Sequence, residues 1–348
     1  PLHTLKNRIF CMKRTNSIYL SVVVCLLFIT SCGLNRSLKK ADKKYEIGEY
    51  ASAAVIYKRL LPNISSANRP LRAEVCYKMG NCYRLTNQNL RAEGAYGKAI
   101  RYDVQDSLAY IYYGEVLRKL KKYTEAAAFY RKYLNYDDAN TWAVNGLKSS
   151  ENVKNWEKVE SPFIVKIETP LNSRKSEFSP AFGDDQGSSV YFTSSRDNQS
   201  TGNKLSKITG LRNNDIFIAK KNNSGKWEDP TALDEIINSE YDEGSCCFSS
   251  DGKTMYFTRC RSVVGVTLGA EIYVTQRAGG EWTSPKKISL INDSSRSVAH
   301  PAISPDNKYL YFVSDMRGGF GGKDLWRCLR INDSEWELPE NLGPDINT

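Results

Sequence analysis

The sequence predicts an α+β protein of two domains, in which an array of helical repeats precedes a domain built only of β-strands. Two observations predict this order. Small and aromatic residues recur between 73 and 140, where Gly114 follows Gly80 by 34 residues. After Trp156 this helical period disappears, and short apolar strands separated by turn residues run to the end of the chain. A chain of 348 residues is long enough for both domains.

The helical part consists of two matching copies, 73–106 and 107–140, which follow a degenerate first copy. A 34-residue period is typical of the tetratricopeptide repeat, in which small residues let two helices approach and aromatic residues fill the space between repeats. Residues 141–156 are predicted to form a capping helix with Trp142 and Leu147 on its covered side, so we assign 32–156 to this α-solenoid. The matching positions are Met79, Gly80, Tyr83, Ala92, Tyr96 and Ala99 in one copy, and Tyr113, Gly114, Leu117, Ala126, Tyr130 and Tyr133 in the next.

The same register turns one side of the first helix of each repeat toward solvent. Concave helical arrays usually take peptides or partner helices on this side. The candidates for such a protein-binding groove, all expected to be exposed, are Asn81, Arg84, Tyr112 and Arg118. For each of them, an ordinary surface position remains the open alternative.

The β-strand part contains three copies of one strand pattern within 171–348. Each copy has an aromatic strand, tight turns such as Asp251-Gly252, and a tryptophan. Regular short strands at this period predict propeller blades of four strands each. We interpret Trp227, Trp282 and Trp336 as core or inter-blade residues, with a platform for sugars as the alternative.

Three blades cannot close a ring, because each end of the wedge would expose a bare sheet edge. The tail 343–348 resembles the entry into a fourth copy, so we expect an amino-terminal fragment with about three blades of an incomplete, truncated propeller. The stretch 157–170 is assigned to a linker and a first strand, since 163–167 is apolar and rich in β-branched residues.

The amino terminus has the features of an export signal. Residues 1–11 show no pattern of an export signal or of a folded element and are interpreted as upstream readthrough. Residues 12–31 are interpreted as the signal peptide, because they combine a short basic start with an apolar run too short to span a membrane. The run ends in the lipobox pattern of bacterial lipoproteins, Ile29, Thr30, Ser31 and Cys32. This pattern implies acyl chains on Cys32 and a lipid anchor, while a plain signal peptide is the alternative.

The formal net charge of +10 is dispersed, and no run of basic residues typical of nucleic-acid binding stands out. The densest cluster, Lys39-Lys40 and Lys43-Lys44, follows the predicted anchor directly. Lysines beside a lipid anchor favour anionic headgroups, although a solvated helix face is the simpler interpretation of the cluster.

Reactive groups are few, so we expect no enzyme, no cofactor and no metal site. His300 precedes a proline and is interpreted as a packed histidine rather than a base. The glycine-rich segment 317–323 lacks the Ser or Thr that follows a phosphate loop. The acids at 184–185 and 242–243 lie in or beside turns and lack the spacing of a calcium loop.

Nine cysteines are present, of which Cys11 and Cys25 would leave with the signal. No pair of the others has the spacing of a zinc or redox site. A bridge from Cys246 or Cys247 to Cys260 stays open, because an exported location permits disulfides. The residues expected to be small buried thiols are Cys76, Cys82, Cys246, Cys247, Cys260 and Cys328.

The segment from Ser304 to Gly319, Ser-Pro-Asp-Asn-Lys-Tyr-Leu-Tyr-Phe-Val-Ser-Asp-Met-Arg-Gly-Gly, resembles the PD40 (WD40-like) repeat of TolB-type propellers. The order of lipid anchor, tetratricopeptide (TPR) array and PD40 propeller is similar to that of Bacteroidetes outer-membrane lipoproteins of the OmpA family, which include a component of type IX secretion. The resemblance implies a non-enzymatic scaffold in the outer membrane that faces the periplasm and binds envelope proteins through both repeat domains. It also implies binding to peptidoglycan through a carboxy-terminal domain missing from this sequence. The alternative is a glycan- or peptide-binding surface lipoprotein of the SusD kind.

Overall fold

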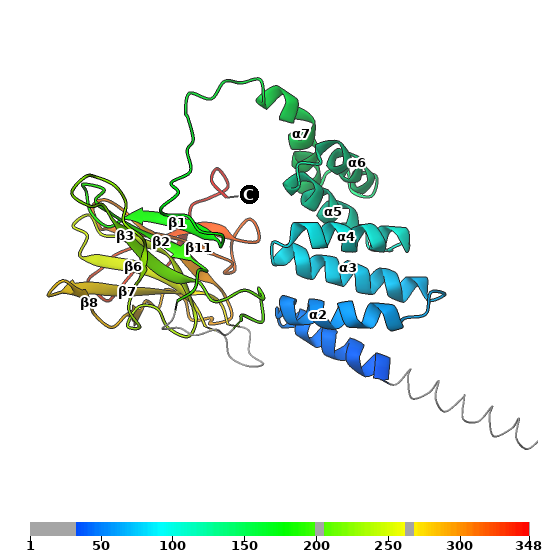
Figure 1. Cartoon of the computed structure of the whole chain (residues 1–348), viewed down its shortest axis with the longest axis horizontal. Helices are drawn as coiled ribbons and strands as arrows, with labels where there is room; N and C mark the ends of the chain where they lie inside the picture. The colour runs from blue at the N-terminus through cyan, green and yellow to red at the C-terminus, as the bar shows by residue number, and fades with distance from the viewer. Residues whose placement is uncertain (1–32, 199–204, 262–267, 348) are drawn as a thin grey trace, which may run out of the picture. The chain divides into compact units, whose positions relative to one another are not determined.

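The computed structural model describes residues 33–198, 205–261 and 268–347. The chain divides into two compact units. One contains the helices up to Pro162 together with Lys207–Gly210, and the other contains the remaining residues from Phe163 on, which include the strands. Figure 1 labels the helices and strands of both units.

The helical unit is a succession of helix pairs (Figure 1). Each helix from α2 to α7 packs on the next one, and α5 also contacts both α3 and α7. The second helix of one repeat therefore lies between two first helices, as in an α-solenoid. The helices are 33–46, α2 Tyr50–Leu60, α3 Arg69–Leu85, α4 Asn89–Arg101, α5 Leu108–Lys119, α6 Tyr123–Leu134 and α7 Thr141–Trp156.

The turn inside each helix pair has the same backbone conformation. Gly48, Asn87 and Lys121, which stand between the paired helices, have positive φ angles of 77°, 55° and 61°. A left-handed residue at this point ends one helix and lets the chain reverse into the next. Lys121 follows Asn87 by 34 residues, so the backbone confirms the predicted repeat period.

Small residues bring the paired helices together, as the repeat pattern predicts. A Cβ atom added at Gly80 would lie 2.8 Å from the ring of Tyr96, and one added at Gly114 would lie 3.2 Å from the ring of Tyr130. Gly146 of α7 faces the same Tyr130 ring. Both tyrosines are 0% exposed, so these contacts form the core of the array and attach the capping helix to it.

The expected position of Trp142 is wrong. Its side chain is 44% exposed, whereas Ala143, Gly146 and Ser150 are the buried residues of α7. Successive residues of a helix are turned by about 100° from one another, so Trp142 lies just outside the face that packs on α6. Leu147, also expected on the covered side, does pack against the core.

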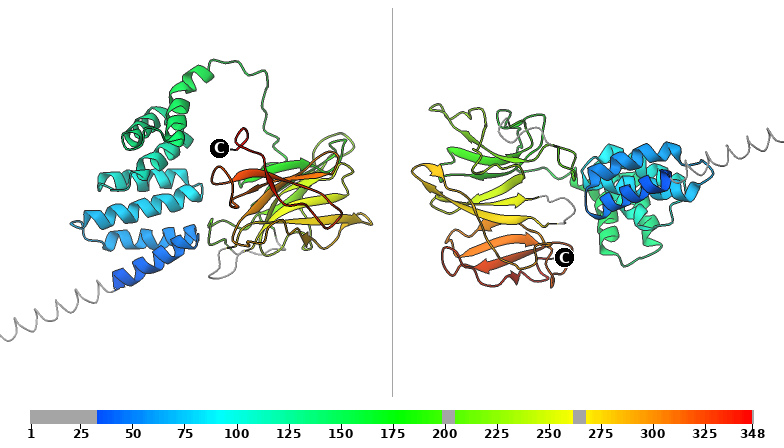
Figure 2. Two further views of the ribbon diagram at one scale, coloured as in Figure 1. Left: turned by 180° about the vertical axis from the view of Figure 1, so that it is seen from behind. Right: turned by 90° about the horizontal axis from the view of Figure 1, so that it is seen from below.

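The described part of the β unit contains three antiparallel sheets in which successive strands pair, except that the last strand of the second sheet pairs with the strand two before it (Figure 2). The first strand of the middle sheet, β5, contacts the first strands of both other sheets. The first sheet contains β1 Glu177–Phe182, β2 Ser189–Ser194, β3 Asp215–Lys220 and β4 Thr231–Ala232. The second contains β5 Asp242–Phe248, β6 Thr254–Cys260, β7 Glu271–Ala278, β8 Glu281–Trp282 and β9 Lys286–Lys287, and the third contains β10 Val298–Ile303, β11 Tyr309–Ser314, β12 Asp324–Leu329 and β13 Glu340–Asn341.

The apolar residues of these strands fill the spaces between sheets. Tyr191 and Phe257 lie in the cluster between the first two sheets, and Tyr256 and Phe312 lie in the cluster between the last two. Among the described residues, the three sheets do not form a closed ring. The structure therefore confirms repeated antiparallel sheets after the helices, and the propeller remains a prediction.

The first strand of each sheet contains a bulge at the same position. Ser179, Ser245 and His300 have φ angles of 50°, 51° and 54°, and the strand register shifts there in every case. Non-glycine residues rarely adopt this conformation. The bulge presents its backbone N–H to the preceding sheet, since Ser245 donates to Thr193 Oγ1 and His300 donates to Thr258 Oγ1, both at 2.9 Å.

The strand expected within 157–170 does not form. Residues 157–176 contain no strand, and the first strand of the unit is β1. Phe163, Ile164 and Val165 are 77%, 88% and 92% exposed. An apolar, β-branched segment becomes a strand only when a neighbour supplies hydrogen-bond partners, and no strand among the described residues pairs with this one.

The six cysteines of the described residues are all free thiols. The bridge considered between Cys246 or Cys247 and Cys260 is not formed, because Cys260 stands opposite Asp242 and Cys247 stands opposite Tyr256 in the β5–β6 register. Cys260 is exposed and Cys247 half-buried, contrary to the expectation of six buried thiols. The four buried thiols are Cys76, Cys82, Cys246 and Cys328.

Candidate functional site

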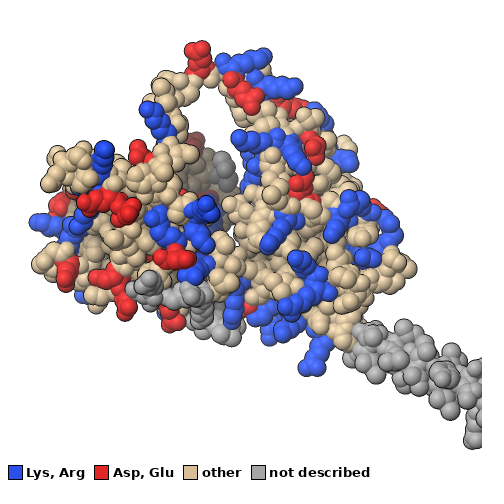
Figure 3. All heavy atoms as spheres, in the orientation of Figure 1, with Lys and Arg blue, Asp and Glu red and all other residues tan. Residues whose placement is uncertain are grey.

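The four predicted groove residues lie on α3 and α5, the first helices of two neighbouring repeats. Lys and Arg side chains predominate on the face of the helical unit drawn in Figure 3. The four residues do not form one exposed surface, because the first of them is buried and the other three are half-buried: Asn81, Arg84, Tyr112 and Arg118.

The expected exposure of Asn81 is wrong, since its exposed fraction is 4%. The Tyr96 hydroxyl donates to Asn81 Oδ1 at 2.6 Å, and Asn81 Nδ2 donates to the Tyr45 hydroxyl at 3.1 Å. Burial raises the pKa of Tyr96, which keeps this hydroxyl a neutral donor. Asn81 thus joins α3 to α4 and to the helix 33–46, and its role is to hold the array together.

Arg84 is engaged within the array. Its Nη1 lies 3.1 Å from Glu115 Oε2, and its guanidinium carbon lies 4.1 Å from the ring centre of Tyr112. Lys119 also approaches Glu115, at 2.7 Å. Two cations therefore share one carboxylate, which leaves this part of α3 and α5 positively charged.

Arg118 has no acidic partner among the described residues, and its buried Nε atom has no hydrogen-bond partner there. Its guanidinium lies at the hydroxyl of Tyr130, where it opposes the rise in pKa that burial gives this tyrosine. A buried donor without an acceptor is costly.

Three aromatic side chains form a row across α3, α5 and α7, which we call the aromatic row: Tyr77, Tyr112 and Trp142. The Tyr77 and Tyr112 rings are stacked with centroids 6.5 Å apart and planes inclined by 9°. The Tyr112 and Trp142 rings are 5.6 Å apart and inclined by 52°. Both tyrosines are half-buried and Trp142 is 44% exposed, so the row offers partly accessible aromatic surface.

Sequence reasoning found Tyr112 and missed the other two members of the aromatic row. Tyr112 follows Tyr77 by 35 residues and Trp142 follows Tyr112 by 30, so a constant 34-residue period does not connect them. A weaker signal in the sequence could have found them, because each first helix from α3 onward contains an aromatic residue outside its core positions.

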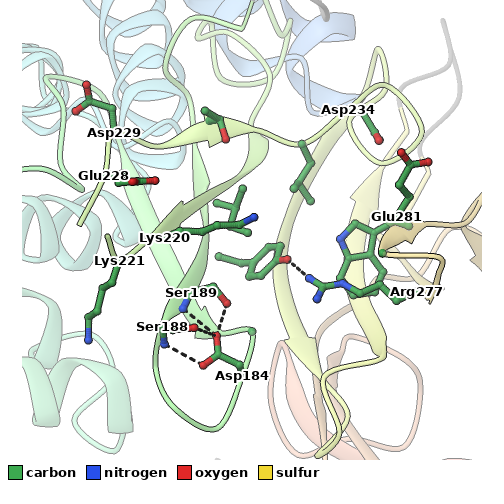
Figure 4. A pocket seen from close by; sticks show the side chains of 17 residues that line it. Asp184, Ser188, Ser189, Lys220, Lys221, Glu228, Asp229, Asp234, Arg277 and Glu281 are labelled. Carbon is green, nitrogen blue, oxygen red and sulfur yellow. Dashed lines mark hydrogen bonds between the residues drawn. The ribbon is translucent and has the colours of Figure 1, made fainter. Parts of the chain in front are cut away.

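A pocket of about 780 Å³ lies between the first two sheets (Figure 4). Its walls come from the β1–β2 turn, β3, β4 and the β7–β8 hairpin. The cations Lys220, Lys221 and Arg277 line it together with several acids. The acids are Asp184, Glu228, Asp229, Asp234 and Glu281.

Several polar groups that line this pocket already bind one another. The Ser189 hydroxyl donates to Asp184, as do the backbone N–H groups of Ser188 and Ser189 at 2.9 and 2.8 Å, and these bonds hold the pKa of the Asp184 carboxyl below its usual range. Arg277 donates to the Tyr191 hydroxyl at 2.5 Å and stacks on the Trp282 ring. The pocket is therefore an open cleft between two sheets, lined by side chains of both charges.

Each recurring tryptophan packs beneath a basic side chain from the strand opposite it. The pairs are cross-strand neighbours at the outer hairpin of each sheet, and Trp282 is only 8% exposed. The rings are therefore covered on one face by a cation–π contact. The distances to the ring centre are 4.7 Å for Lys221 and Trp227, 4.6 Å for Arg277 and Trp282, and 5.9 Å for Arg330 and Trp336.

The glycine-rich segment 317–323 wraps around a carboxylate of its own chain. The backbone N–H groups of Phe320 and Gly321 donate to Asp324, at 2.5 and 3.1 Å, and Asn341 Nδ2 donates to it at 3.0 Å. Asp324 is 2% exposed. The amides that would hold a phosphate are thus used to bind Asp324, in keeping with a loop between two strands.

His300 is held by its backbone in the β10 bulge, and burial together with Lys323 lowers its pKa. Within 33–198, 205–261 and 268–347, no cluster of three or more His, Cys, Asp or Glu side chains has the arrangement of a metal site. The acids at 184–185 and 242–243 hold turns and strand ends, and Glu243 is paired with Arg259 at 2.7 Å.

The predicted lipobox lies outside the described residues and stays a prediction: Ile29, Thr30, Ser31 and Cys32. In the part of the chain that the structure describes, no helix combines the length and the apolar character needed to cross a membrane.

No protein-family model matches the sequence, and no curated protein matches it. Solved structures resemble parts of the chain. The second TPR domain of human RPAP3, in complex with an HSP70 peptide, is 21% identical with a TM-score of 0.31 and covers 35% of this chain and 98% of its own. YrrB, a TPR protein with an unusual peptide-binding site, is also 21% identical with a TM-score of 0.31, covering 34% of this chain and 59% of its own.

A puromycin-hydrolysing peptidase of Mycobacterium tuberculosis is 15% identical with a TM-score of 0.32, and the match covers 50% of this chain and 24% of the peptidase. Likenesses of this extent do not assign a ligand or an activity. The helical unit is a tetratricopeptide array on its own geometry, namely paired helices, a 34-residue period and glycine–tyrosine contacts within each pair.

Proposed function

We propose that this protein is a non-enzymatic scaffold that holds partner proteins of a bacterial cell envelope at the outer membrane. The observation that carries the proposal is the aromatic row, with the cation Arg118 on the same helix as its central member Tyr112. Tyr, Trp and Arg are the residue types that dominate the binding energy of protein interfaces. Here the row crosses three helices, and a cation with an unsatisfied buried donor lies on the middle one.

A peptide or partner helix laid across α3, α5 and α7 would stack on Tyr112 and Trp142. It would also supply acceptors to the N–H groups of Arg118, a half-buried cation without an ion pair among the described residues. Ligand binding would cover Arg118 further, which is favourable only if the ligand pairs with its N–H groups. The proposed ligand is therefore a segment with an aromatic or apolar side chain and a nearby carboxylate or carbonyl group.

The β unit is proposed to be part of a PD40-type propeller that provides a second interaction surface. Support comes from the repeated order of strands, from the bulge in each first strand, and from the hydrogen bonds that link a threonine of one sheet to the bulge of the next. A propeller blade is a four-stranded antiparallel sheet of this order.

The envelope location rests on the sequence. The proposal includes acylation of Cys32, anchorage in the outer membrane and a periplasmic orientation, as the resemblance to OmpA-family lipoproteins such as the type IX secretion component PorE implies. Binding to peptidoglycan would belong to a carboxy-terminal domain outside this sequence. The glycan-binding alternative gains no support from the recurring tryptophans, since a basic side chain covers each ring.

The proposal is tested by affinity purification of the intact lipoprotein from cross-linked envelopes. A double variant, Arg118→Glu with Trp142→Ala, removes the cation and the exposed ring. A matched control, Lys154→Glu with Trp156→Ala, makes the same changes at exposed positions near the end of α7. We expect the same envelope proteins with wild type and control and their loss with the first variant, while circular dichroism verifies that both variants retain the helices. Equal recovery with both variants, or turnover of a peptide or glycan by the purified protein, would contradict the proposal.

A further inference from the structure

The first helix of the array, 33–46, has two opposite faces. Leu34, Leu38, Ala41 and Tyr45 pack into the hydrophobic core of the helical unit. On the other side, four exposed cations are spaced three, one and three residues apart, which places them on one face of a helix. We call these residues the basic face: Arg36, Lys39, Lys40 and Lys43.

The charges of the basic face are not neutralised within the described residues. None of its four side chains takes part in an ion pair there. Asp42, the nearest acid on the helix, is turned inward, where it accepts hydrogen bonds from Tyr57 at 2.7 Å and Lys78 at 2.9 Å. Lys44 lies outside the face and pairs with Glu49 at 2.5 Å. Glu46, the other acid of this helix, is exposed at its end.

The basic face lies close in sequence to the predicted lipid anchor. Lys43 is ten residues from Gly33, so the helical rise puts the whole face within about 15 Å of the residue next to Cys32. Electrostatic attraction in physiological salt acts over a Debye length of ~8 Å. If the helix lies along a membrane to which the chain is held through Cys32, all four cations come within that length of the headgroups. Lys and Arg side chains are visible over the first helices of the unit in Figure 3.

We infer that the basic face is a membrane-contact surface that binds anionic phospholipid headgroups and lays the first helix against the bilayer. The inference rests on the proposed lipid anchor for its setting, because the anchor supplies the membrane. Four cations on one exposed helix face are complementary to a surface of phosphate groups. The opposite, apolar face of the helix packs on the array and so keeps the cations directed outward. The contact would orient the helical array on the membrane, which a flexible acyl anchor alone does not do.

The test uses the chain from Gly33 onward, which lacks the acyl group but retains the core residues of both described units. Its binding to vesicles of phosphatidylcholine mixed with phosphatidylglycerol is compared with binding to phosphatidylcholine alone. Each cation near an anionic surface raises the partition constant about fivefold. We expect binding to the mixed vesicles only, with loss of binding in ~1 M salt, where the Debye length is ~3 Å.

Charge reversal at Lys39→Glu with Lys43→Glu is expected to lower the partition constant about 25-fold or more. The matched control, Lys58→Glu with Arg59→Glu, makes the same charge change at exposed positions of α2 and should cost far less. The conservative variant Lys39→Arg with Lys43→Arg should bind as wild type does. Circular dichroism verifies that all variants retain the helices.

Equal binding to zwitterionic vesicles, or an equal loss in the α2 control, would overturn the inference. Failure of the anchor is seen separately, because acyl labelling of Cys32 in cells does not depend on the basic face. If labelling is absent while the vesicle result holds, the proposed anchor fails and the headgroup-binding surface stands.

Discussion

The guanidinium of Arg84 lies over the ring of Tyr112, 4.1 Å from its centre, and joins the first helices of two neighbouring repeats. Glu115 accepts an ion pair from the same guanidinium at 3.1 Å. Stacking and charge pairing together fix Tyr112 at the centre of the aromatic row, between Tyr77 and Trp142. The central part of the proposed binding surface is thus set in place before any ligand arrives.

The glycine–tyrosine contact makes a prediction about stability. Gly80→Ala places a Cβ atom 2.8 Å from the Tyr96 ring, and overpacking of this kind costs about 1–3 kcal/mol. The matched control is Gly94→Ala in α4, where nothing lies within 4 Å and helix propensity predicts a gain of up to ~1 kcal/mol. Urea unfolding followed by circular dichroism measures both. A stability of Gly80→Ala equal to or above that of Gly94→Ala would refute the contact.

The hydrogen bonds of Asn81 make a second prediction. Asn81→Ala leaves the Tyr96 hydroxyl buried without an acceptor, at a cost of about 1–3 kcal/mol. Tyr96→Phe removes the hydroxyl instead, and the double variant should lose less than the sum of the two single changes. A double-mutant cycle of unfolding free energies measures this coupling. Strict additivity would show that the two side chains do not interact.

The pKa of Asp184 gives a prediction about pH. Hydrogen bonds from Ser189 and Ser188 lower it from 3.8, so the folded state binds protons less readily than the unfolded state. The stability that Asp184 contributes is therefore full above about pH 3.8 and is lost as pH falls below that value. Asp184→Asn should be less stable than wild type at neutral pH, with a difference that shrinks in acid. Asp185→Asn, at the exposed neighbouring position, serves as the control and should show no such trend.

The exposed segment between the units predicts where proteases cut. Residues 157–170 contain no helix or strand, and Ile164 and Val165 are almost fully exposed. Trypsin should cleave first at Lys158 or Lys166, because an accessible, extended backbone fits a protease site. Mass spectrometry of the first products should yield two fragments that match the two units. A first cut inside one of the helical repeats would contradict this organisation.

The lipid anchor makes a prediction about labelling in cells. Labelled palmitate should enter the wild-type protein and not Cys32→Ala, because the lipobox pattern places the acyl groups on that cysteine. Cys260→Ala, which removes the exposed thiol of the β unit, should be labelled as wild type is. Equal labelling of the Cys32→Ala variant would show that the anchor is elsewhere.

Repeat positions were predictable from the sequence because the same packing problem recurs at each of them. Gly80 and Gly114 each leave room for a tyrosine ring of the paired helix. Because this contact recurs in each repeat, the two glycines stand 34 residues apart and the sequence shows the pattern. Asn81 was not predictable in this way. Its burial depends on Tyr45, which belongs to the degenerate first copy, so no matching position in another repeat shows the same bond.

The β unit shows a different limit. The recurrence of the three tryptophans was visible in the sequence, but their cation–π partners were not predicted. A basic residue does precede each tryptophan by five or six positions. The apolar segment 163–167 was predicted to be a strand because its residue types favour β-structure. A strand also requires a neighbouring strand that supplies hydrogen-bond partners, and the composition of the segment does not show whether one is present. Sheet closure depends on contacts between copies and cannot be read from one copy.

The most direct test of the scaffold proposal is photocross-linking in living cells from the two exposed tryptophans of α7. Trp142 lies in the aromatic row and is 44% exposed, whereas Trp156, at the end of the same helix, is 58% exposed. Each is replaced in turn by a photoreactive phenylalanine analogue, which keeps an aromatic ring at the position. The proposal predicts a discrete cross-linked envelope protein from position 142 and none from position 156. Cross-links of equal yield from both positions, or from 156 alone, would contradict it.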